Sequence, residues 1–425
     1  MNAVPTGPAV LVLDGQTTQA LACVRSLGRA GYTVYVASPR RWPVAAASRH
    51  CRGHYRLAVE TVGSFAQLRA WAAERGVRFV LPMTERACLL CTADTAAWTA
   101  AGMVLGCAGE ADLLQVFDKA RTLERARTVG LRVPPTYFPT STAEAQAAAA
   151  EVGFPCVVKA RFSYVRDGEQ MLADPGVAYV ARQEDLLPAV EARRQGPHWP
   201  LIQRYISGSA SGEAAHGVGI SALCDHGRVV AWFAHERLRD IRPSGSGSSL
   251  RRSVPIDPQL RESARKLLAQ LRWHGPAMFE FRADDDDAGG PWLIEINGRF
   301  WGSLQLAIAS GSDLPRLWVS ILAGQRATPA ASYWPGITLR WLWGDVRRLG
   351  HIMLGPPPGY PDRYPGVWRG LCEVFGAQPA GTRSETWDPA DPAPAVVEWV
   401  QAVEELVARG LRERRSVNRE KVTTP

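Results

Sequence analysis

Hydrophobic and polar positions near the start of the chain form short apolar runs separated by longer amphipathic stretches. A helical pattern over 18–30 follows the first run and closes at Gly31. The apolar runs that predict buried strands lie at 10–13, 33–37, 77–81 and 103–105. Buried strands separated by helical segments are typical of a parallel sheet covered by helices. We therefore expect an α/β unit with a parallel sheet over residues 1–112.

The pattern changes after residue 112, where helical segments mix with short strands. Helices are expected over 113–129, 142–152 and 258–271, with a final helix over 395–409. Strands are expected at 156–160, 201–206, 218–223, 229–235, 277–282 and 292–297. Asp225-His226-Gly227 predicts a hairpin turn, so the strands on either side of it should be antiparallel. The mixture predicts an α+β unit in this part of the chain.

Composition places the chain among ordinary globular proteins, because 46% of its residues are hydrophobic and 21% are charged. It contains no apolar run of about 18 residues and no secretory signal pattern, so we expect a cytoplasmic protein that does not enter a membrane. The formal net charge of +8 includes a basic tail at 409–421, interpreted as a solvated terminus rather than a nucleic-acid site. Cys88 and Cys91 lack a second ligand pair and are expected to be buried helix cysteines rather than zinc ligands.

The strongest chemical signal is a set of polar residues inside two apolar strands. Glu295 and Asn297 alternate with isoleucines, and Glu280 stands between two phenylalanines. Because side chains alternate between the faces of a strand, pairing of the two strands would place Glu280 beside Glu295. Like charges in that position are destabilising unless a cation joins them, and carboxylate and amide oxygens suit Mg²⁺. The alternative, a solvated acidic face, is disfavoured by the core-like flanking residues.

Three basic residues accompany the acidic pair. Lys159 ends a hydrophobic strand, where a lysine needs an anionic partner such as a nucleotide phosphate or a nearby carboxylate. Lys119 is ambiguous by itself, since a lysine on a helix is usually solvated. Arg299, two residues beyond Asn297, is placed to contact a phosphate or a substrate carboxylate.

Taken in order, these residues resemble the ATP-grasp superfamily, over about residues 10–325. The motifs that carry the resemblance are Lys119, Lys159, Gln203-Arg204-Tyr205-Ile206-Ser207-Gly208, Glu280 and Glu295-Ile296-Asn297-Gly298-Arg299. The chain looks like the carboxylate–amine ligase branch, which is related to the ATP-binding domains of carbamoyl-phosphate synthetase and biotin carboxylase. The resemblance implies a Rossmann-like pre-ATP-grasp domain at 1–112, a two-lobed ATP-grasp domain at 113–330 and a C-terminal extension at 331–425.

The resemblance also implies roles for individual residues. Lys119 and Lys159 would hold the phosphates of ATP, and the hinge strand formed by Gln203, Arg204, Tyr205 and Ile206 would contact adenine. Mg²⁺, or Mn²⁺ in its place, would be bound by Glu280, Glu295 and Asn297. Arg299 and Arg251 would be the catalytic residues, with Arg299 steadying the transferring phosphoryl group or the acyl phosphate and Arg251 facing the acceptor side. The residues expected to face the substrate are Arg237, Arg239 and Ser249.

The chain departs from the family pattern after Lys159, after the serine-rich loop and at 207–216, a segment that is longer than usual. The phosphate-covering segment after Lys159 is usually rich in glycine, but residues 161–176 contain only Gly168 and Gly176, so lid closure is expected to differ. A serine- and glycine-rich loop at 243–249 matches a loop near the acceptor side of related ligases, although a simple hairpin connector is the alternative. In this branch of the family, a glutamate often follows the arginine that comes after the loop. This chain has Arg252 at that position, so the identity of the substrate stays open.

The resulting hypothesis is an ATP- and Mg²⁺-dependent ligase that activates a carboxylate as an acyl phosphate, which an amine then attacks to form an amide. We expect small-molecule carboxylate and amine substrates, such as amino acids or peptides, and no nucleic-acid partner; a homodimer is one assembly to test. Two alternatives stay open. One is a nucleotide-binding regulatory protein without catalysis, and the other is an ATP-grasp carboxylase or kinase with a different acceptor. The chain itself contains no Met-Lys biotin-carrier motif.

Overall fold

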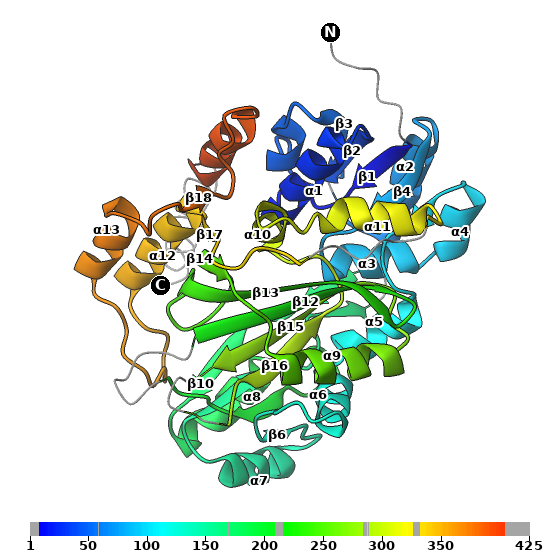
Figure 1. Ribbon diagram of the computed structural model, residues 1–425. Helices are drawn as coiled ribbons and strands as arrows, with labels where there is room; N and C mark the ends of the chain where they lie inside the picture. Colours follow the sequence, from blue (N-terminus) through cyan, green and yellow to red (C-terminus); the bar gives the residue numbers. More distant parts are fainter. Residues whose placement is uncertain are drawn as a thin grey trace, which may run out of the picture.

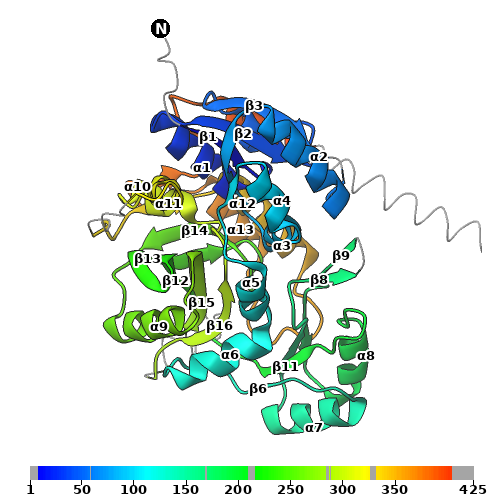
Figure 2. The same ribbon diagram turned by 90° about the vertical axis from the view of Figure 1, so that its right-hand side faces the viewer.

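The computed structural model describes residues 8–403 except for 58, 168–169, 209–215, 284–286, 288 and 326–331. Figure 1 shows a parallel sheet near the N-terminus at the top, a large and mostly antiparallel sheet through the centre and a smaller lobe with α7 at the bottom. Figure 2 shows that the small lobe stands beside the large sheet, at the end of the molecule away from the N-terminal unit. The expected combination of α/β and α+β units is therefore confirmed.

The N-terminal unit is a five-stranded sheet with the order β3-β2-β1-β4-β5, and its strands run parallel. Its central strands form because their residues are mainly apolar, as in β1, which is buried along its whole length. Strand β3 was absent from the sequence prediction because its residues are largely polar and half-exposed, as suits a strand at a sheet edge. The elements are β1 (Ala9–Val12), α1 (Thr18–Arg29), β2 (Thr33–Ser38), β3 (Cys51–Arg56), α2 (Val62–Ala73), β4 (Val77–Leu81), α3 (Glu85–Thr92), α4 (Thr95–Ala100) and β5 (Val104–Leu105).

The single helix predicted over 113–129 is wrong, because the chain forms two helices there. Helix α5 (Glu110–Phe117) ends at Asp118, whose backbone is extended. The Asp118 side chain then accepts a hydrogen bond from the N–H of Ala120 and caps α6 (Lys119–Thr128). This break places Lys119 in the first turn of α6, beside the interface between the lobes.

The small lobe is a four-stranded sheet with the order β10-β7-β11-β6. The alanine-rich α7 packs on it because its small side chains let the helix approach buried strand residues such as Val158 and Ile202. A two-stranded hairpin, β8–β9, extends from this lobe. The elements are β6 (Thr136–Tyr137), α7 (Thr142–Val152), β7 (Cys156–Lys159), β8 (Tyr164–Asp167), β9 (Gln170–Ala173), β10 (Val177–Val180), α8 (Leu186–Glu191) and β11 (Leu201–Arg204).

The large sheet has the order β16-β15-β12-β13-β14-β17-β18. The predicted turn between β12 and β13 is confirmed, and His226 and Gly227 both adopt the positive φ angles that tight hairpins require. Helices α5, α6 and α9 cover one face over a core that includes Phe279, Phe281 and Leu293. The elements are β12 (His216–Asp225), β13 (Arg228–Asp240), β14 (Ser248–Ser253), α9 (Pro258–Gln270), β15 (Gly275–Ala283) and β16 (Trp292–Asn297).

The segment after residue 331 completes the large sheet. Strand β17 (Thr338–Arg340) pairs antiparallel with β14, and β18 (Arg383–Ser384) pairs parallel with β17. Helices α12 (Leu342–Leu354) and α13 (Val367–Phe375) lie between these two strands in the sequence. The final helix is present over 393–403, and the rest of its predicted length lies outside the described residues. The sheet thus crosses the boundary expected between 330 and 331, and the division into three domains stays a prediction.

The N-terminal unit and the large sheet share one core. Helices α10 (Leu304–Ala309) and α11 (Leu314–Leu322) lie between them, and Trp301 and Trp318 pack in the same cluster as Leu27 and Phe79. Cys88 and Cys91 are buried in α3, as predicted. Within the described part of the chain, no helix combines the length and the apolar character needed to span a membrane.

Candidate functional site

A cavity of about 220 Å³ lies between the small lobe and the large sheet. Strands β7, β10 and β11 contribute one wall, and β13, β15 and β16 contribute the other. We call it the nucleotide cavity because most of the residues assigned to nucleotide and metal by sequence meet there. These are Lys119, Lys159, Gln203, Arg204, Tyr205, Ile206, Glu280 and Glu295. Arg237, which was expected to face the substrate, also lines this cavity.

Glu280 and Glu295 are direct cross-strand neighbours in the register of β15 and β16, as the alternation predicts. Beyond them the register shifts, so that Phe281 pairs with Leu293 in the core and Ile294 is the extra residue of a bulge. Ile294 consequently lines the nucleotide cavity, and the expectation that it faces the core is wrong. Both carboxylates remain on the cavity side of the sheet.

Arg237 reaches Glu280 across strand β12, with an Nη1–Oε1 distance of 2.8 Å. Gly217 on β12 makes this possible, because a Cβ there would lie 2.5 Å from the Cδ atom of Arg237. The ion pair gives Glu280 a cationic neighbour and also fixes the Arg237 guanidinium beside the acidic pair. It is nearly buried on the arginine side, where the side chain is 9% exposed.

Lys159 ends strand β7, with its side chain in the cavity and 6% of its surface exposed. Burial lowers the pKa of Lys159 to about 8, despite the opposing effect of Glu295 and Glu280. Lys119 adds a second positive charge, and its Nζ atom lies 4.0 Å from Asp174. Two buried lysines near a few carboxylates form a site that an additional anion such as a phosphate would stabilise.

Glu295 lies at the centre of these charges. Burial alone would raise the pKa of Glu295, but Lys119, Lys159 and Arg299 outweigh burial and hold it below its usual value. The carboxylate is therefore charged at neutral pH, as a metal ligand must be.

Asn297 and Arg299 continue from β16 next to the cavity. Asn297 donates from Nδ2 to Glu295 at 3.4 Å, and its Oδ1 accepts a hydrogen bond from Arg299 at 2.9 Å. The amide oxygen that sequence analysis assigns to the metal thus faces the guanidinium of Arg299. These contacts connect Arg299 to the acidic pair through one intermediate side chain.

The predicted hinge residues form the strand end that joins the two lobes. Gln203 donates to the hydroxyl of Thr136 at 2.7 Å, and the backbone N–H of Arg204 donates to Pro135 at 2.9 Å. The hydroxyl of Tyr205 donates to Asp362 in the C-terminal segment at 2.5 Å. The hinge is therefore fixed on both sides, by strand β6 and by a segment more than a hundred residues away.

The structure places Arg251, Arg239 and Ser249 away from the nucleotide cavity. Arg251 is 3% exposed and forms a buried ion pair with Glu385 of the C-terminal segment. Arg239 pairs with Asp345 at 2.8 Å, and the side chain of Ser249 is fully buried. A register shift between Arg237 and Arg239 explains why two arginines so close in sequence have different carboxylate partners.

Several residues that line the cavity were not assigned to nucleotide, metal or substrate from the sequence. Asp174, Tyr179 and Arg282 line the nucleotide cavity, as do the loop residues Ser244, Gly245 and Ser246. The hydroxyl of Tyr179 donates to the backbone oxygen of Ser244 at 2.6 Å, which connects the small lobe to the serine-rich loop. Only the loop had a signal in the sequence. Asp174 and Tyr179 follow a hairpin whose fold the local pattern did not indicate.

The donor set fits a divalent cation. Glu280 and Glu295 offer carboxylate oxygens on one face of adjacent strands, in a polar cavity that also contains cationic groups for phosphates. Mg²⁺ is commonly held by one or two carboxylates together with substrate phosphates and water. Bound there, it would neutralise the like charges of the pair, which Arg237 and the lysines balance in the structure described.

Comparison with known proteins gives a family for part of the chain. Residues 216–343 match the family model described as "ATP-grasp in the biosynthetic pathway with Ter operon". This region contains Glu280, Glu295, Asn297 and Arg299, whereas Lys119 and Lys159 lie before it.

Similarity to curated proteins extends over about half of the chain. The carbamoyl phosphate synthase large chain of Vibrio cholerae is 27% identical over 218 residues, which cover 49% of this chain and 18% of that protein. D-alanine–D-alanine ligase of Ectopseudomonas mendocina is 28% identical over 219 residues, covering 48% of this chain and 64% of the ligase. The chain thus matches less than a fifth of the synthase.

Solved structures show the same fold at lower identity. N5-carboxyaminoimidazole synthetase from Staphylococcus aureus aligns with a TM-score of 0.59 and 14% identity, over 78% of this chain and 82% of that one. The biotin carboxylase domain of 2-oxoglutarate carboxylase from Hydrogenobacter thermophilus aligns with a TM-score of 0.58 and 19% identity, over 78% and 72%. Residues 216–343 thus match an ATP-grasp family model, and about half of the chain is similar in sequence to carbamoyl phosphate synthase and D-alanine–D-alanine ligase.

Proposed function

We propose that the protein is an ATP- and Mg²⁺-dependent ligase that converts a carboxylate into an acyl phosphate and then into an amide. The observation that carries this proposal is the cross-strand pair Glu280 and Glu295 in one cavity with Lys119 and Lys159. Acidic metal ligands opposite basic phosphate ligands are what phosphoryl transfer needs, since the catalyst mainly positions the phosphates and neutralises charge. The two curated relatives support a ligase, and the one named for joining two amino acids supports amide formation.

In this proposal Glu280 and Glu295 hold Mg²⁺, or Mn²⁺, with Asn297 as a further oxygen ligand if its amide turns from Arg299. The ion supplies Lewis-acid neutralisation of the phosphate oxygens when bound. Lys119 and Lys159 hold phosphate oxygens, and Tyr205 and Ile206 contact the adenine edge at the hinge. The substrate carboxylate and the amine are themselves the nucleophiles, so the reaction needs no nucleophilic side chain of the protein.

The reaction has two balanced displacements. An oxygen of the substrate carboxylate attacks the γ-phosphorus, the bond to the β–γ bridging oxygen breaks, and ADP leaves. The amine nitrogen then attacks the acyl carbon, the carbon–oxygen bond to phosphate breaks, and the nitrogen loses a proton. Arg237 and Arg299 lie where they would stabilise the negative charge of the transferring group, because Arg237 pairs with Glu280 and Arg299 contacts Asn297, the third proposed metal ligand. Arg251, Arg239 and Ser249 have no part in this step because each is placed elsewhere.

The test is an ADP-release screen of the purified chain with pairs of carboxylates and amines, read together with mass spectrometry of the product. We expect ADP, phosphate and an amide in equal amounts, and loss of all three in Glu295→Gln. Glu124→Gln on the exposed side of α6 is the matched control and should behave as wild type. Tight ATP binding without ADP release from any pair would favour the regulatory alternative, and a carboxylated or phosphorylated product would favour the other acceptor class.

A further inference from the structure

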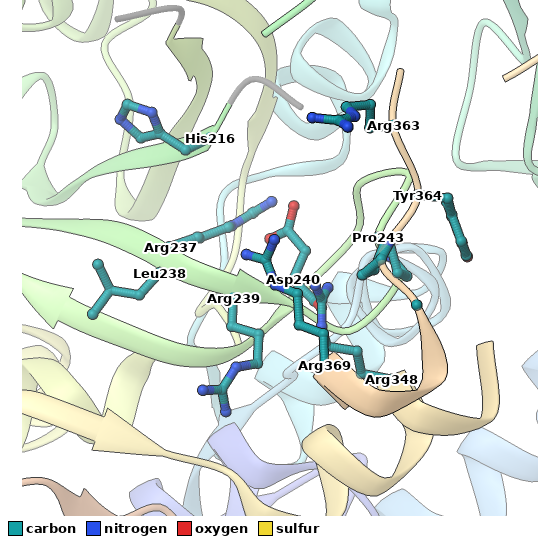
Figure 3. Close-up of a pocket in the computed structure, with 12 residues that line it drawn as sticks. His216, Arg237, Leu238, Arg239, Asp240, Pro243, Arg348, Arg363, Tyr364 and Arg369 are labelled. Carbon is teal, nitrogen blue, oxygen red and sulfur yellow. The ribbon is translucent and has the colours of Figure 1, made fainter. Parts of the chain in front are cut away.

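A second cavity, of about 420 Å³, lies next to the nucleotide cavity, and we call it the arginine pocket. Figure 3 shows its residues converging from strand β13 on one side and from the C-terminal segment on the other. Its arginines are Arg237, Arg239, Arg348, Arg363 and Arg369, whereas Asp240 is the only acidic residue that lines it among the described residues. Such a concentration of one charge favours an anionic ligand.

Arg237 connects the two cavities, because it lines both and holds Glu280 of the acidic pair at 2.8 Å. Pro243 lines the arginine pocket, and the next residue, Ser244, lines the nucleotide cavity. A molecule in the arginine pocket would therefore reach toward the metal side of the nucleotide cavity. The serine-rich loop forms part of the wall between the two spaces.

Some of these arginines already have structural partners. Arg239 pairs with Asp345 at 2.8 Å, and Arg348 pairs with Glu373 at 2.7 Å and donates to the backbone oxygen of Asp240. These contacts hold the C-terminal segment against β13 and fix the shape of the pocket. Arg348 is 8% exposed, and its removal would leave the largely buried Glu373 with Arg369, at 3.4 Å, as its remaining ion-pair partner.

Arg363 differs from these residues. It is exposed, and no other described residue forms a hydrogen bond or an ion pair with it. Figure 3 shows its side chain on the opposite side of the pocket from β13, in the direction toward which Arg237 extends. A planar guanidinium in this position can donate two parallel hydrogen bonds to a carboxylate or a phosphate.

We propose that the arginine pocket binds a second anionic group of the substrate, a carboxylate or a phosphate, while the reacting carboxylate lies at the acidic pair. The inference rests on the proposed ligase function and narrows it to substrates with an additional negative charge. It also assigns a role to the segment after residue 331, which supplies Arg348, Arg363 and Arg369 to the pocket. Arg363 would be a specificity-determining residue.

The experiment uses the full chain loaded with Mg²⁺ and a non-hydrolysable ATP analogue, which occupies the phosphate sites of the nucleotide cavity. Calorimetric titrations with O-phosphoserine, citrate and alanine compare a phosphate, several carboxylates and a single carboxylate. We expect O-phosphoserine or citrate to bind more tightly than alanine, and Arg363→Ala to weaken that binding about tenfold by loss of one charge-assisted contact. Arg363→Lys should recover part of the affinity, and the preferred probe identifies the anionic group.

Arg52→Ala provides the matched control, since Arg52 is an exposed arginine on β3 in the N-terminal unit. It should bind the probes as wild type does, and both variants should retain wild-type affinity for the nucleotide analogue. Equal probe affinity in Arg363→Ala and wild type, or no binding of either anionic probe to wild type, would overturn the inference. Failure of wild type to bind the nucleotide analogue would instead refute the ligase proposal, and the anion titrations repeated without nucleotide would still test the pocket.

Discussion

The nucleotide cavity and the arginine pocket share Arg237 but are built in different ways. In the nucleotide cavity, charges of both signs come from neighbouring strands, where alternation brings Glu280 and Glu295 together. In the arginine pocket, charges of mainly one sign come from strand β13 and from a segment about a hundred residues later. The first arrangement follows from local chain geometry, whereas the second depends on how a distant segment docks.

The two regions therefore differ in the role of their charged groups, which can bind a ligand in one region and hold the C-terminal segment in place in the other. Charged groups in the nucleotide cavity are buried without a full set of protein partners, so they are available to a ligand. Around the arginine pocket, most buried charges are already paired with the C-terminal segment. We therefore expect changes in the first region to alter turnover and changes at the buried pairs of the C-terminal segment to alter stability.

The largest effect is expected for Lys159→Ala. If Lys159 holds a phosphate of ATP, as proposed, loss of its side chain should lower the rate of ATP turnover about a thousandfold, as for other preorganised charge-stabilising groups. ADP release measures the rate, and circular dichroism verifies that the variant is folded. Lys266→Ala, at an exposed position on α9, is the control and should leave the rate unchanged. Wild-type ADP release from a folded Lys159→Ala protein would remove Lys159 from the proposed site.

The next effect concerns Arg251, which sequence analysis assigned to catalysis and the structure pairs with Glu385 in a buried position. Arg251→Met should lower the free energy of unfolding by about 3 to 5 kcal/mol, because it leaves a buried carboxylate unpaired. Chemical denaturation measures the change. Its neighbour Arg252 is half-exposed and pairs with Glu236, so Arg252→Met should cost about 1 kcal/mol or less. Unchanged stability together with lost turnover would restore the catalytic assignment.

The third effect is a pH dependence that arises from Lys159. Its pKa falls from 10.5 in the unfolded chain to about 8 in the folded protein, so the buried charge opposes folding below pH 8 by roughly 3 kcal/mol. Between these two pKa values the unfolded state holds more protons, and stability contributed by this group rises with pH. The stability advantage of Lys159→Met over wild type should therefore shrink between pH 7 and pH 10.

Denaturation curves of the nucleotide-free proteins at several pH values measure this difference, and the variant serves as the reference for all other titrating groups. A constant difference across the range would show that Lys159 keeps an ordinary pKa and would weaken the case for an unsatisfied charge in the cavity.

The sequence predicted the nucleotide cavity better than its surroundings for a physical reason. Strand alternation determines the side of a sheet on which Glu280 and Glu295 lie, once the strands pair. Where a bulge adds one residue to a strand, alternation no longer predicts the side on which the following residues lie. This happens at Ile294 and between Arg237 and Arg239. Neither bulge has a glycine or another local signal at the inserted position.

The other features that the sequence did not predict depend on contacts between segments far apart in the chain. Asp118 interrupts a continuous helical pattern because its side chain caps α6 and accepts from Arg161 at 2.6 and 2.7 Å. Pairing of β17 with β14, and of Arg251 with Glu385, joins segments that local periodicity does not relate. Hydrophobic patterning predicts which face of an element is buried, but it carries no information about the distant partner that covers that face.

The smallest effect tests whether the two regions communicate. Tyr205 lines the nucleotide cavity, and its hydroxyl donates to Asp362, the residue before Arg363. Burial raises the pKa of Tyr205, so the hydroxyl remains a donor at physiological pH. Tyr205→Phe should reduce the free energy of unfolding by about 1 kcal/mol, the usual contribution of one hydrogen bond. Tyr137→Phe, on an exposed tyrosine of β6, is the control for loss of a hydroxyl.

If this hydrogen bond couples the hinge to the segment that carries Arg363, then Tyr205→Phe should also reduce the extent to which the nucleotide analogue tightens anion binding. Titration of O-phosphoserine with and without the analogue measures this coupling, which must be reciprocal between the two ligands. A loss of stability with unchanged coupling would show that the bond only holds the segment in place. Because Arg237 touches both cavities, coupling that survives in Tyr205→Phe would then be assigned to the Arg237–Glu280 pair.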